Sequence, residues 1–422
     1  MRVLLYSLNY APELVGIGKY NTEMLEWLAQ QGHEVRAIVA PAYYPRWRVE
    51  PGLSGSFYSV AERNGVRIYR CPLWVPRQPT GLRRVLHLLS FMVSSAPVLA
   101  MQWRWKPDVV LLTEPPLVCA PSVLAFCALS GSGSWLHVQD LEVDTGLGLG
   151  LIPKQGLRGV IHAIERQLLR RFARLTTISG AMRRSLIAKT SGECPVGLMR
   201  NWVDADAIRP ADSSSLRAEL GIPADAVVCL YSGSMGAKHG LELLAESARL
   251  LSHDASIWFV FCGEGAMRDR LVEASQGLPR VRFLPLQPAE RLAELLSMGD
   301  IHLLPQRAEA ADHVMPSKLA GIFAVERPVV ATALERSELA HALSGRGLFV
   351  PPGDAQAFAG AIGRLAGNPV QRHSLGLAAR AYAEQVLDID VVLSEAMGPS
   401  GGPRASRTAP SAAEAPIRTP DP

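Results

Sequence analysis

The chain has 422 residues, of which 48% are hydrophobic and 19% are charged, and its formal net charge is +4. This length and composition indicate a globular protein of two domains, each large enough to bury its own core. The small positive charge is compatible with anionic ligands or an anionic membrane surface, and we expect no nucleic-acid partner. The N-terminus enters a strand directly and has no signal-peptide pattern, which predicts a cytoplasmic protein.

Six cysteines lie mostly in apolar runs, and none of them has the C-x-x-C spacing of a metal site. Such cysteines behave as small buried hydrophobic residues. We therefore expect buried thiols in a reducing compartment.

The first half of the chain alternates apolar runs with helical patterns. Strands are expected at residues 3–8, 35–39, 66–71, 109–113, 135–138, 175–178 and 196–199, with helices between most of them. This alternation predicts a doubly wound α/β domain at residues 1–205. A dinucleotide-binding domain is not favoured, because Gly16 and Gly18 lack a third glycine and no acidic residue follows the second strand.

The most apolar segment is residues 83–106. Its centre is almost uncharged, and arginine, tryptophan and lysine residues flank it. The run is barely long enough to cross a bilayer, and His87 and Pro97 interrupt it. A helix in the membrane interface fits better, because tryptophans and basic side chains anchor at the headgroups. A buried helix and a true span are the alternatives, and the basic helix at residues 156–172 has either a solvated face or a contact with anionic lipid.

A second α/β domain is expected at residues 206–375. Strands are predicted at residues 227–231, 258–262, 281–284, 301–304, 328–332 and 348–350. After the first of them comes a glycine-rich loop that contains Gly233 and Lys238, and then a helix. Glycines let the backbone approach an anion, and the N–H groups at a helix start favour negative charge. An ordinary turn between strand and helix is the alternative.

The end of the chain divides into two parts. An alanine-rich helical region reaches about residue 396, and we expect its last part, residues 376–396, to pack back across both domains. Residues 397–422 are too poor in apolar side chains to fold, which predicts a disordered tail of no assigned function.

Another group of candidate site residues follows the strand at residues 135–138. His137 lies near the end of this strand, and Asp140, Glu142 and Asp144 lie in the loop after it. Ligands bind at the carboxyl ends of strands in open parallel sheets. A histidine and three acids there are candidates for catalysis; a structural strand-end histidine is the alternative.

Motifs in both halves match a known family. They are Asn9-Tyr10-Ala11-Pro12-Glu13, Gly16-Ile17-Gly18-Lys19-Tyr20, Ala40-Pro41-Ala42-Tyr43-Tyr44-Pro45, His137-Val138-Gln139-Asp140, Asn201-Trp202, Ser232-Gly233, Met315-Pro316-Ser317-Lys318-Leu319 and Val350-Pro351-Pro352-Gly353-Asp354. On these motifs the chain resembles the retaining glycosyltransferases of family 4, and among them bacterial exopolysaccharide enzymes of the colanic-acid type. The resemblance implies a GT-B fold, with two Rossmann-like doubly wound domains facing across a cleft.

The resemblance also implies a reaction and a donor site. A sugar would pass from a nucleotide diphosphate sugar to an acceptor, with retained anomeric configuration. The loop at Gly233, with Lys238, and the N–H groups of Ser317 and Lys318 would hold the diphosphate without a cofactor or an obligatory metal ion. Gly263 would line the nucleotide base.

The N-terminal domain would complete this site. Gly16 and Gly18 would approach the diphosphate when the cleft closes. His137 would contact the sugar near the reacting carbon. One of three acids would orient the acceptor hydroxyl and accept its proton: Asp140, Glu142 or Asp144.

The family pattern is not fully kept. Many members have two glutamates eight residues apart, and the second holds the ribose; His313 and Gly321 stand at those places here, with Glu309 and Asp312 as nearby substitutes. The sequence therefore leaves the donor open between GDP-fucose and UDP-linked sugars. The expected acceptor is a polyprenyl-diphosphate-linked oligosaccharide at the inner face of the cytoplasmic membrane. An inactive GT-B partner subunit and a sugar-nucleotide epimerase are the alternative functions.

Overall fold

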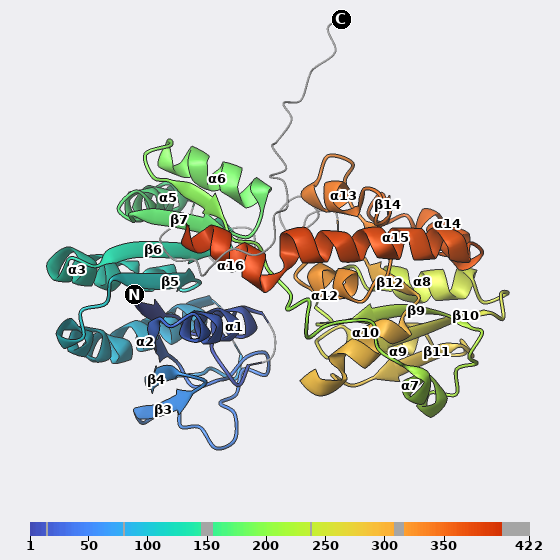
Figure 1. The fold of residues 1–422 in the computed structure, drawn as a ribbon, viewed down its shortest axis with the longest axis horizontal. Coiled ribbons are helices and arrows are strands. Elements are labelled where there is room, and N and C mark those ends of the chain that lie inside the picture. The colour runs from blue at the N-terminus through green and yellow to red at the C-terminus, as the bar shows by residue number, and fades with distance from the viewer. Residues whose placement is uncertain (14–15, 79–80, 145–154, 237–238, 308–315, 399–422) are drawn as a thin grey trace, which may run out of the picture.

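The computed structural model describes residues 1–13, 16–78, 81–144, 155–236, 239–307 and 316–398. Two α/β domains lie side by side, and the last helices of the chain run from the second domain back to the first (Figure 1). The predicted tail beyond residue 398 lies outside the described residues, as do Lys238 and the segment that holds Glu309, Asp312 and His313.

Within the described residues, eight strands form the N-terminal sheet in the order β3-β4-β2-β1-β5-β6-β7-β8. They are β1 (Arg2–Tyr6), β2 (Glu34–Val39), β3 (Ser59–Arg63), β4 (Val66–Arg70), β5 (Val109–Glu114), β6 (Gly133–Val138), β7 (Arg174–Thr177) and β8 (Val196–Leu198). The helices are α1 (Ile17–Gln30), α2 (Gly81–Met101), α3 (Ala120–Ser130), α5 (Gln155–Leu169) and α6 (Gly180–Thr190). From β4 to β7 the strands are parallel and have the order of a doubly wound nucleotide-binding fold, as predicted.

The edge strand β3 was not predicted. It pairs antiparallel with β4, and every residue in it is exposed. A strand without a buried face carries no alternation of apolar and polar residues, so the sequence gives no periodic signal for it.

The C-terminal sheet repeats this topology with six strands in the described part of the chain, in the order β11-β10-β9-β12-β13-β14. They are β9 (Val227–Ser232), β10 (Ile257–Cys262), β11 (Val281–Leu284), β12 (Ile301–Leu304), β13 (Val329–Thr332) and β14 (Gly347–Val350). The helices are α7 (Ser214–Glu219), α8 (Glu242–Leu250), α9 (Arg268–Ala274), α10 (Leu292–Met298), α12 (Lys318–Ala324), α13 (Glu338–Leu343) and α14 (Ala355–Ala366). Every pair of neighbouring strands in it is parallel.

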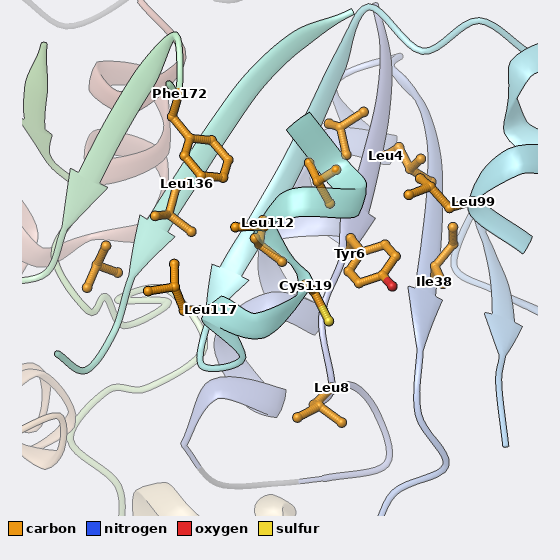
Figure 2. Close-up of a cluster of buried hydrophobic side chains, with 14 of the residues drawn as sticks. Leu4, Tyr6, Leu8, Ile38, Leu99, Leu112, Leu117, Cys119, Leu136 and Phe172 are labelled. Carbon is orange, nitrogen blue, oxygen red and sulfur yellow. The ribbon is translucent and has the colours of Figure 1, made fainter. Parts of the chain in front are cut away.

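Both faces of the N-terminal sheet are buried. Leu4 and Tyr6 of β1 point into one core with α2 and α3, as Figure 2 shows for part of that cluster, whereas Val3 and Leu5 join α1 in another. A strand buried on both faces requires a continuous apolar run. These strands could therefore be predicted from the sequence. All six cysteines are buried and unpaired, as predicted.

The chain's last helices tie the domains together. They are α15 (Pro369–Tyr382), a π-helical segment (Ala383–Leu387) and α16 (Ile389–Met397). The helix α15 packs on the C-terminal domain, whereas Val392 and Leu393 of α16 enter the core of the N-terminal domain. The helical region breaks at Asn368 and Asp388, because each side chain accepts a backbone N–H bond and caps the helix that follows.

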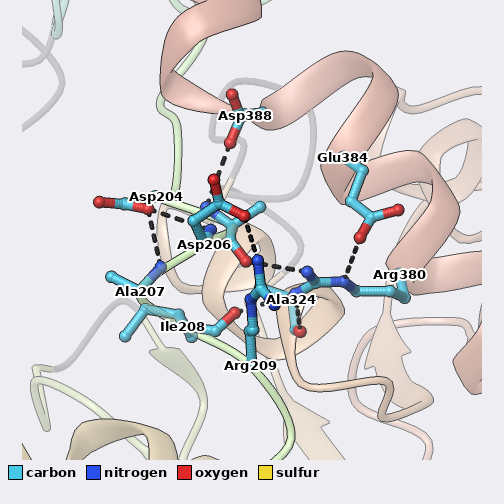
Figure 3. Close-up of polar contacts among 10 residues, drawn as sticks. Asp204, Asp206, Ala207, Ile208, Arg209, Ala324, Arg380, Glu384 and Asp388 are labelled. Atoms are coloured by element: carbon cyan, nitrogen blue, oxygen red, sulfur yellow. Dashed lines mark hydrogen bonds and ion pairs between the residues drawn. The ribbon is translucent and has the colours of Figure 1, made fainter.

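The crossover between the domains is fixed by polar contacts with these helices (Figure 3). The Arg380 guanidinium donates to the carbonyl oxygens of Ala205, Ile208 and Ala324, at 2.6 to 2.9 Å. The Asp388 carboxylate accepts the Ala205 N–H at 3.1 Å. These bonds hold the segment that joins the two sheets.

Candidate active site

The site lies where the carboxyl ends of the two sheets meet. In each domain the order of strands reverses between two neighbours, β1 and β5 in the first sheet and β9 and β12 in the second. Ligands of doubly wound folds bind at such switch points, outside the carboxyl ends of the strands. The loops that follow β1 and β9 are therefore the places to look for a ligand site.

Two hydrogen bonds connect the carboxyl-end side of one sheet to the carboxyl-end side of the other. The Tyr20 hydroxyl of α1 donates to the carbonyl oxygen of Ser317, at 3.3 Å. The Ala181 N–H, in the first turn of α6, donates to the Glu338 carboxylate of α13 at 3.1 Å. All four residues follow the carboxyl ends of strands, so the two switch points face each other.

The loop after β9 is held by backbone packing. Gly233 and Gly263 have φ of 136° and 146°, and a Cβ atom on Gly263 would lie 1.9 Å from the Gly233 carbonyl oxygen. The Gly233 N–H donates to the Cys262 carbonyl oxygen at 2.9 Å. Gly263 is therefore required for this close approach, and its expected contact with the nucleotide base stays a prediction.

The Lys318 side chain also reaches this loop. Its ammonium nitrogen lies 4.0 Å from the centroid of the Tyr231 ring, and a Cβ atom on Gly233 would lie 2.7 Å from it. Burial lowers the pKa of Lys318 to about 7. The sequence indicated only the N–H groups of Ser317 and Lys318 as phosphate ligands. The role of this side chain was not predicted, because the contact depends on how two distant loops meet.

The loop after β1 is organised by Glu13. Its carboxylate accepts the backbone N–H groups of Tyr43 and Tyr44 at 3.0 Å and the Asn9 side-chain amide at 2.9 Å. A Cβ atom on Gly18 would lie 2.6 Å from the Glu13 carboxylate. Gly18 thus leaves room for a buried acid that the sequence motif contains but to which we assigned no role.

Gly16 caps the first helix of the same domain. Its φ of 62° is in the left-handed region, and α1 begins at the next residue. No acidic residue occupies the first turn of α1. Its N-terminal N–H groups are therefore suited to an anion, and the contact of Gly16 with the donor stays a prediction.

His137 is buried at the end of β6. Its Nδ1 lies 3.0 Å from the Thr176 hydroxyl, and its Nε2 lies 2.9 Å from the Gln139 side-chain amide. Burial lowers the pKa of His137 to about 3, so the ring is neutral at physiological pH. The protein itself engages both ring nitrogens, and the contact of His137 with the sugar stays a prediction.

The three acids of the following loop differ in environment. Asp140 is exposed. Glu142 accepts the Leu117 N–H at 2.8 Å, and burial raises its pKa. Asp144 lies 2.8 Å from the Lys189 ammonium of α6, in an ion pair. Its exposure makes Asp140 accessible to an acceptor.

A buried acid lies beneath this loop. Glu114 ends β5, and its pKa is raised well above the usual value by burial and by the charges of Glu142 and Glu165. Lys189, which pairs with Glu165 at 2.6 Å, opposes this shift. Glu114 was not predicted as a site residue; its only signal in the sequence is an acid at a strand end followed by two prolines.

Two doubly wound domains that face each other at their switch points, with glycine-rich loops on both sides, have the architecture of the GT-B class of glycosyltransferases. The chain matches the family models "Glycosyl transferase 4-like domain" over residues 15–202 and "Glycosyl transferases group 1" over residues 226–368. It belongs to this glycosyltransferase family, as its motifs predicted.

A relative matches over nearly the full length. The chain is 42% identical over 407 residues to WcaI of Escherichia coli (strain K12), named as a colanic acid biosynthesis glycosyl transferase. The match covers 94% of this chain and 98% of WcaI. The chain is thus a glycosyltransferase related to WcaI.

Solved structures agree on the fold. Sucrose-phosphate synthase from Thermosynechococcus elongatus superposes with a TM-score of 0.72 at 18% identity, covering 93% of this chain and 96% of that one. HepE of Anabaena, in complex with UDP and glucose, superposes with a TM-score of 0.67 at 14% identity, covering 94% of this chain and 98% of HepE. At these identities the likeness shows the fold alone, and it confirms the predicted GT-B architecture.

Proposed function

We propose that this glycosyltransferase transfers a hexose, with fucose as one candidate, from a nucleotide diphosphate sugar to a lipid-linked oligosaccharide in exopolysaccharide synthesis. The full-length similarity to WcaI carries this proposal. HepE, a protein of the same fold, has been solved in complex with UDP-glucose, which supports a nucleotide sugar as donor. The acceptor we infer is a polyprenyl-diphosphate-linked oligosaccharide.

The reaction needs one bond to break and one to form. The bond from the anomeric carbon to the diphosphate breaks, and its electron pair leaves with the diphosphate. The acceptor oxygen bonds to the same carbon on the same face, and its proton passes to Asp140. The N–H groups at the start of α1 and the glycine loop at Gly233 stabilise the departing charge, so no metal ion is required. Transfer that stops on addition of EDTA would contradict this last inference.

Nucleotide binding is the direct test of the proposed donor site. The purified full-length protein is titrated calorimetrically with GDP, UDP and dTDP, without added metal ion. We expect selective binding of one nucleotide, which identifies the base of the donor. Absence of binding to all three, from protein shown to be folded by circular dichroism, would favour an inactive partner subunit instead.

A membrane surface is the second partner that we infer, because α2 is apolar on both sides. Its inner face packs into the core beside the sheet through Phe91, Val98 and Leu99. Its outer face exposes large apolar side chains: Leu82, Val85, Leu86, Val93 and Met101. In the described residues, α2 with the turn after it is the one helix long and apolar enough to cross a membrane. Since one side of it packs on the domain, an interfacial position fits better than a span.

Neighbouring segments extend this apolar face of α2. Phe57 is 74% exposed, and Leu129, on the helix α3 that contacts α2, is 72% exposed. The Tyr58 hydroxyl donates to the Ser94 carbonyl oxygen at 2.8 Å, which places residues 57–58 beside α2. Exposed basic residues flank the face: Arg83, Arg104 and Lys106. Apolar side chains ringed by basic ones match the surface of an anionic bilayer, which supports a location at the inner face of the cytoplasmic membrane.

Vesicle sedimentation tests this surface. The wild-type chain is expected to sediment with vesicles that contain anionic lipid, and Val93→Glu is expected to weaken this binding several-fold. Val370→Glu is the matched control, since Val370 is equally an exposed valine on a helix but belongs to the C-terminal domain. A wild-type chain that stays in the supernatant would rule out the membrane contact.

A further inference from the structure

We propose that the Lys318 ammonium group forms the ion pair with the donor diphosphate, next to Gly233. The inference rests on the proposed function and adds a side-chain role to a residue so far considered for its N–H group. It also predicts that donor binding takes up a proton.

The position of Lys318 is set by three elements of the C-terminal domain. It begins α12, after the carboxyl end of β12, and its side chain extends to the start of the loop after β9. The ammonium nitrogen stands 4.0 Å from the Tyr231 ring centroid, within the range of a cation–π contact. The missing side chain of Gly233 provides the space for it, since a Cβ atom there would approach Nζ to 2.7 Å and Cε to 2.9 Å.

Lys318 has no anionic partner in the described part of the chain. No carboxylate oxygen of those residues lies within 4.0 Å of its ammonium nitrogen, whereas Lys19 pairs with Glu23 and Lys189 pairs with two acids. A partly buried cation without a counter-ion is unfavourable. A diphosphate beside Gly233 would supply that counter-ion.

Two titratable groups of the described residues lie near Lys318, Tyr231 and His302, and neither carries a charge at neutral pH. Burial raises the pKa of Tyr231 and lowers the pKa of His302, on β12, to about 3. The Tyr20 hydroxyl, from the opposite domain, donates to the Ser317 carbonyl oxygen beside Lys318. Burial therefore dominates, and it lowers the pKa of Lys318 to about 7 in the empty site.

An arriving diphosphate favours the charged form of Lys318 and raises its pKa. Above pH 7 the empty site is mostly neutral, so the protein takes up a proton when the donor binds. Affinity must then fall as pH rises, by roughly eightfold between pH 7.5 and pH 8.5. Nucleoside diphosphates do not obscure this effect, because a terminal phosphate with a pKa of about 6 is already ionised in that range.

The test titrates the full-length protein with GDP, UDP and dTDP at pH 7.5 and pH 8.5. We expect the nucleotide that binds wild type to lose roughly eightfold in affinity between the two pH values. Lys318→Met is expected to bind it about 10-fold to 100-fold more weakly at pH 7.5, because a charge-assisted bond is lost. Lys318→Arg keeps a permanent cation and is expected to bind without the pH dependence.

The outcomes separate this inference from the proposed function. Arg364→Met, at an exposed position on α14, is the control and is expected to bind like wild type. If wild type and Lys318→Met bind a nucleotide equally, with no pH dependence, Lys318 is not the phosphate cation and the function stands. If wild type binds none of the three nucleotides, both fail. Heats of wild-type binding in two buffers of different ionisation enthalpy count the protons taken up, which tests the inference even if a variant does not fold.

Discussion

The Tyr20 hydroxyl donates a hydrogen bond to the Ser317 carbonyl oxygen, and so joins the first helix of one domain to the donor side of the other at 3.3 Å. The ring of Tyr20 packs edge-on against Trp202, with centroids 5.2 Å apart. The ring thus packs within its own domain, and the hydroxyl makes a hydrogen bond to the other domain.

Tyr20→Phe is expected to raise KM for the donor several-fold with little change in unfolding. The substitution keeps the ring and removes one hydrogen bond, which contributes about 1 kcal/mol. Tyr58→Phe is the matched control, since its hydroxyl also donates to a backbone carbonyl oxygen, that of Ser94, away from the site. Equal kinetics for both variants would show that the interdomain bond does not affect the donor.

Glu13→Gln is expected to destabilise the fold by about 1 to 3 kcal/mol and to weaken donor binding. One carboxylate oxygen accepts two backbone N–H groups and the other accepts the Asn9 amide, so an introduced NH2 group must face a donor. Urea unfolding and donor titration of the variant measure both effects. A variant as stable as wild type would show that the Glu13 bonds are not needed to hold the loop after β1.

Gly263→Ala is expected to lower the free energy of unfolding by about 2 kcal/mol or more, because the new Cβ atom would lie 1.9 Å from the Gly233 carbonyl oxygen. Gly277→Ala is the control that measures the effect of backbone strain without a steric clash. Gly277 also has a positive φ, of 78°, but a Cβ atom there meets nothing within 4 Å. Thermal unfolding of the two variants is the measurement, and equal losses would contradict the close packing of the two loops.

Glu114→Gln is expected to remove the loss of stability that the wild-type chain undergoes as pH rises. The folded chain holds the Glu114 proton at a pH where the unfolded chain has released it, since the folded pKa is raised well above the usual value. The contribution of this group to the free energy of unfolding is therefore greatest below the unfolded pKa, about 4.3, and falls as pH rises toward the folded pKa.

Glutamine imitates the neutral acid and does not titrate. Urea unfolding of wild type and Glu114→Gln at pH 5.5 and pH 8.0 should show wild type losing stability relative to the variant as pH rises. A constant difference between the two proteins would mean that Glu114 is ionised in the folded state.

Only part of the candidate site could be predicted from the sequence. Gly233, Gly16 and Gly18 are visible because a glycine between a strand and a helix is a local pattern. The sequence identified His137 as a residue at a strand end. It did not show that the ring is buried, with both nitrogens in contact with other side chains. Whether such a residue faces a ligand or the core depends on the loop that covers it.

The sequence by itself determined the two doubly wound domains. Their strands are buried on both faces, so each requires an apolar run of its own, and this requirement is local. The tertiary structure decided which side chains meet at the switch points. Lys318 reaches Gly233, and Glu13 reaches the backbone of Tyr43, across loops far apart in the chain. These contacts depend on how strands are ordered in a sheet, and no periodic pattern along the chain records that order.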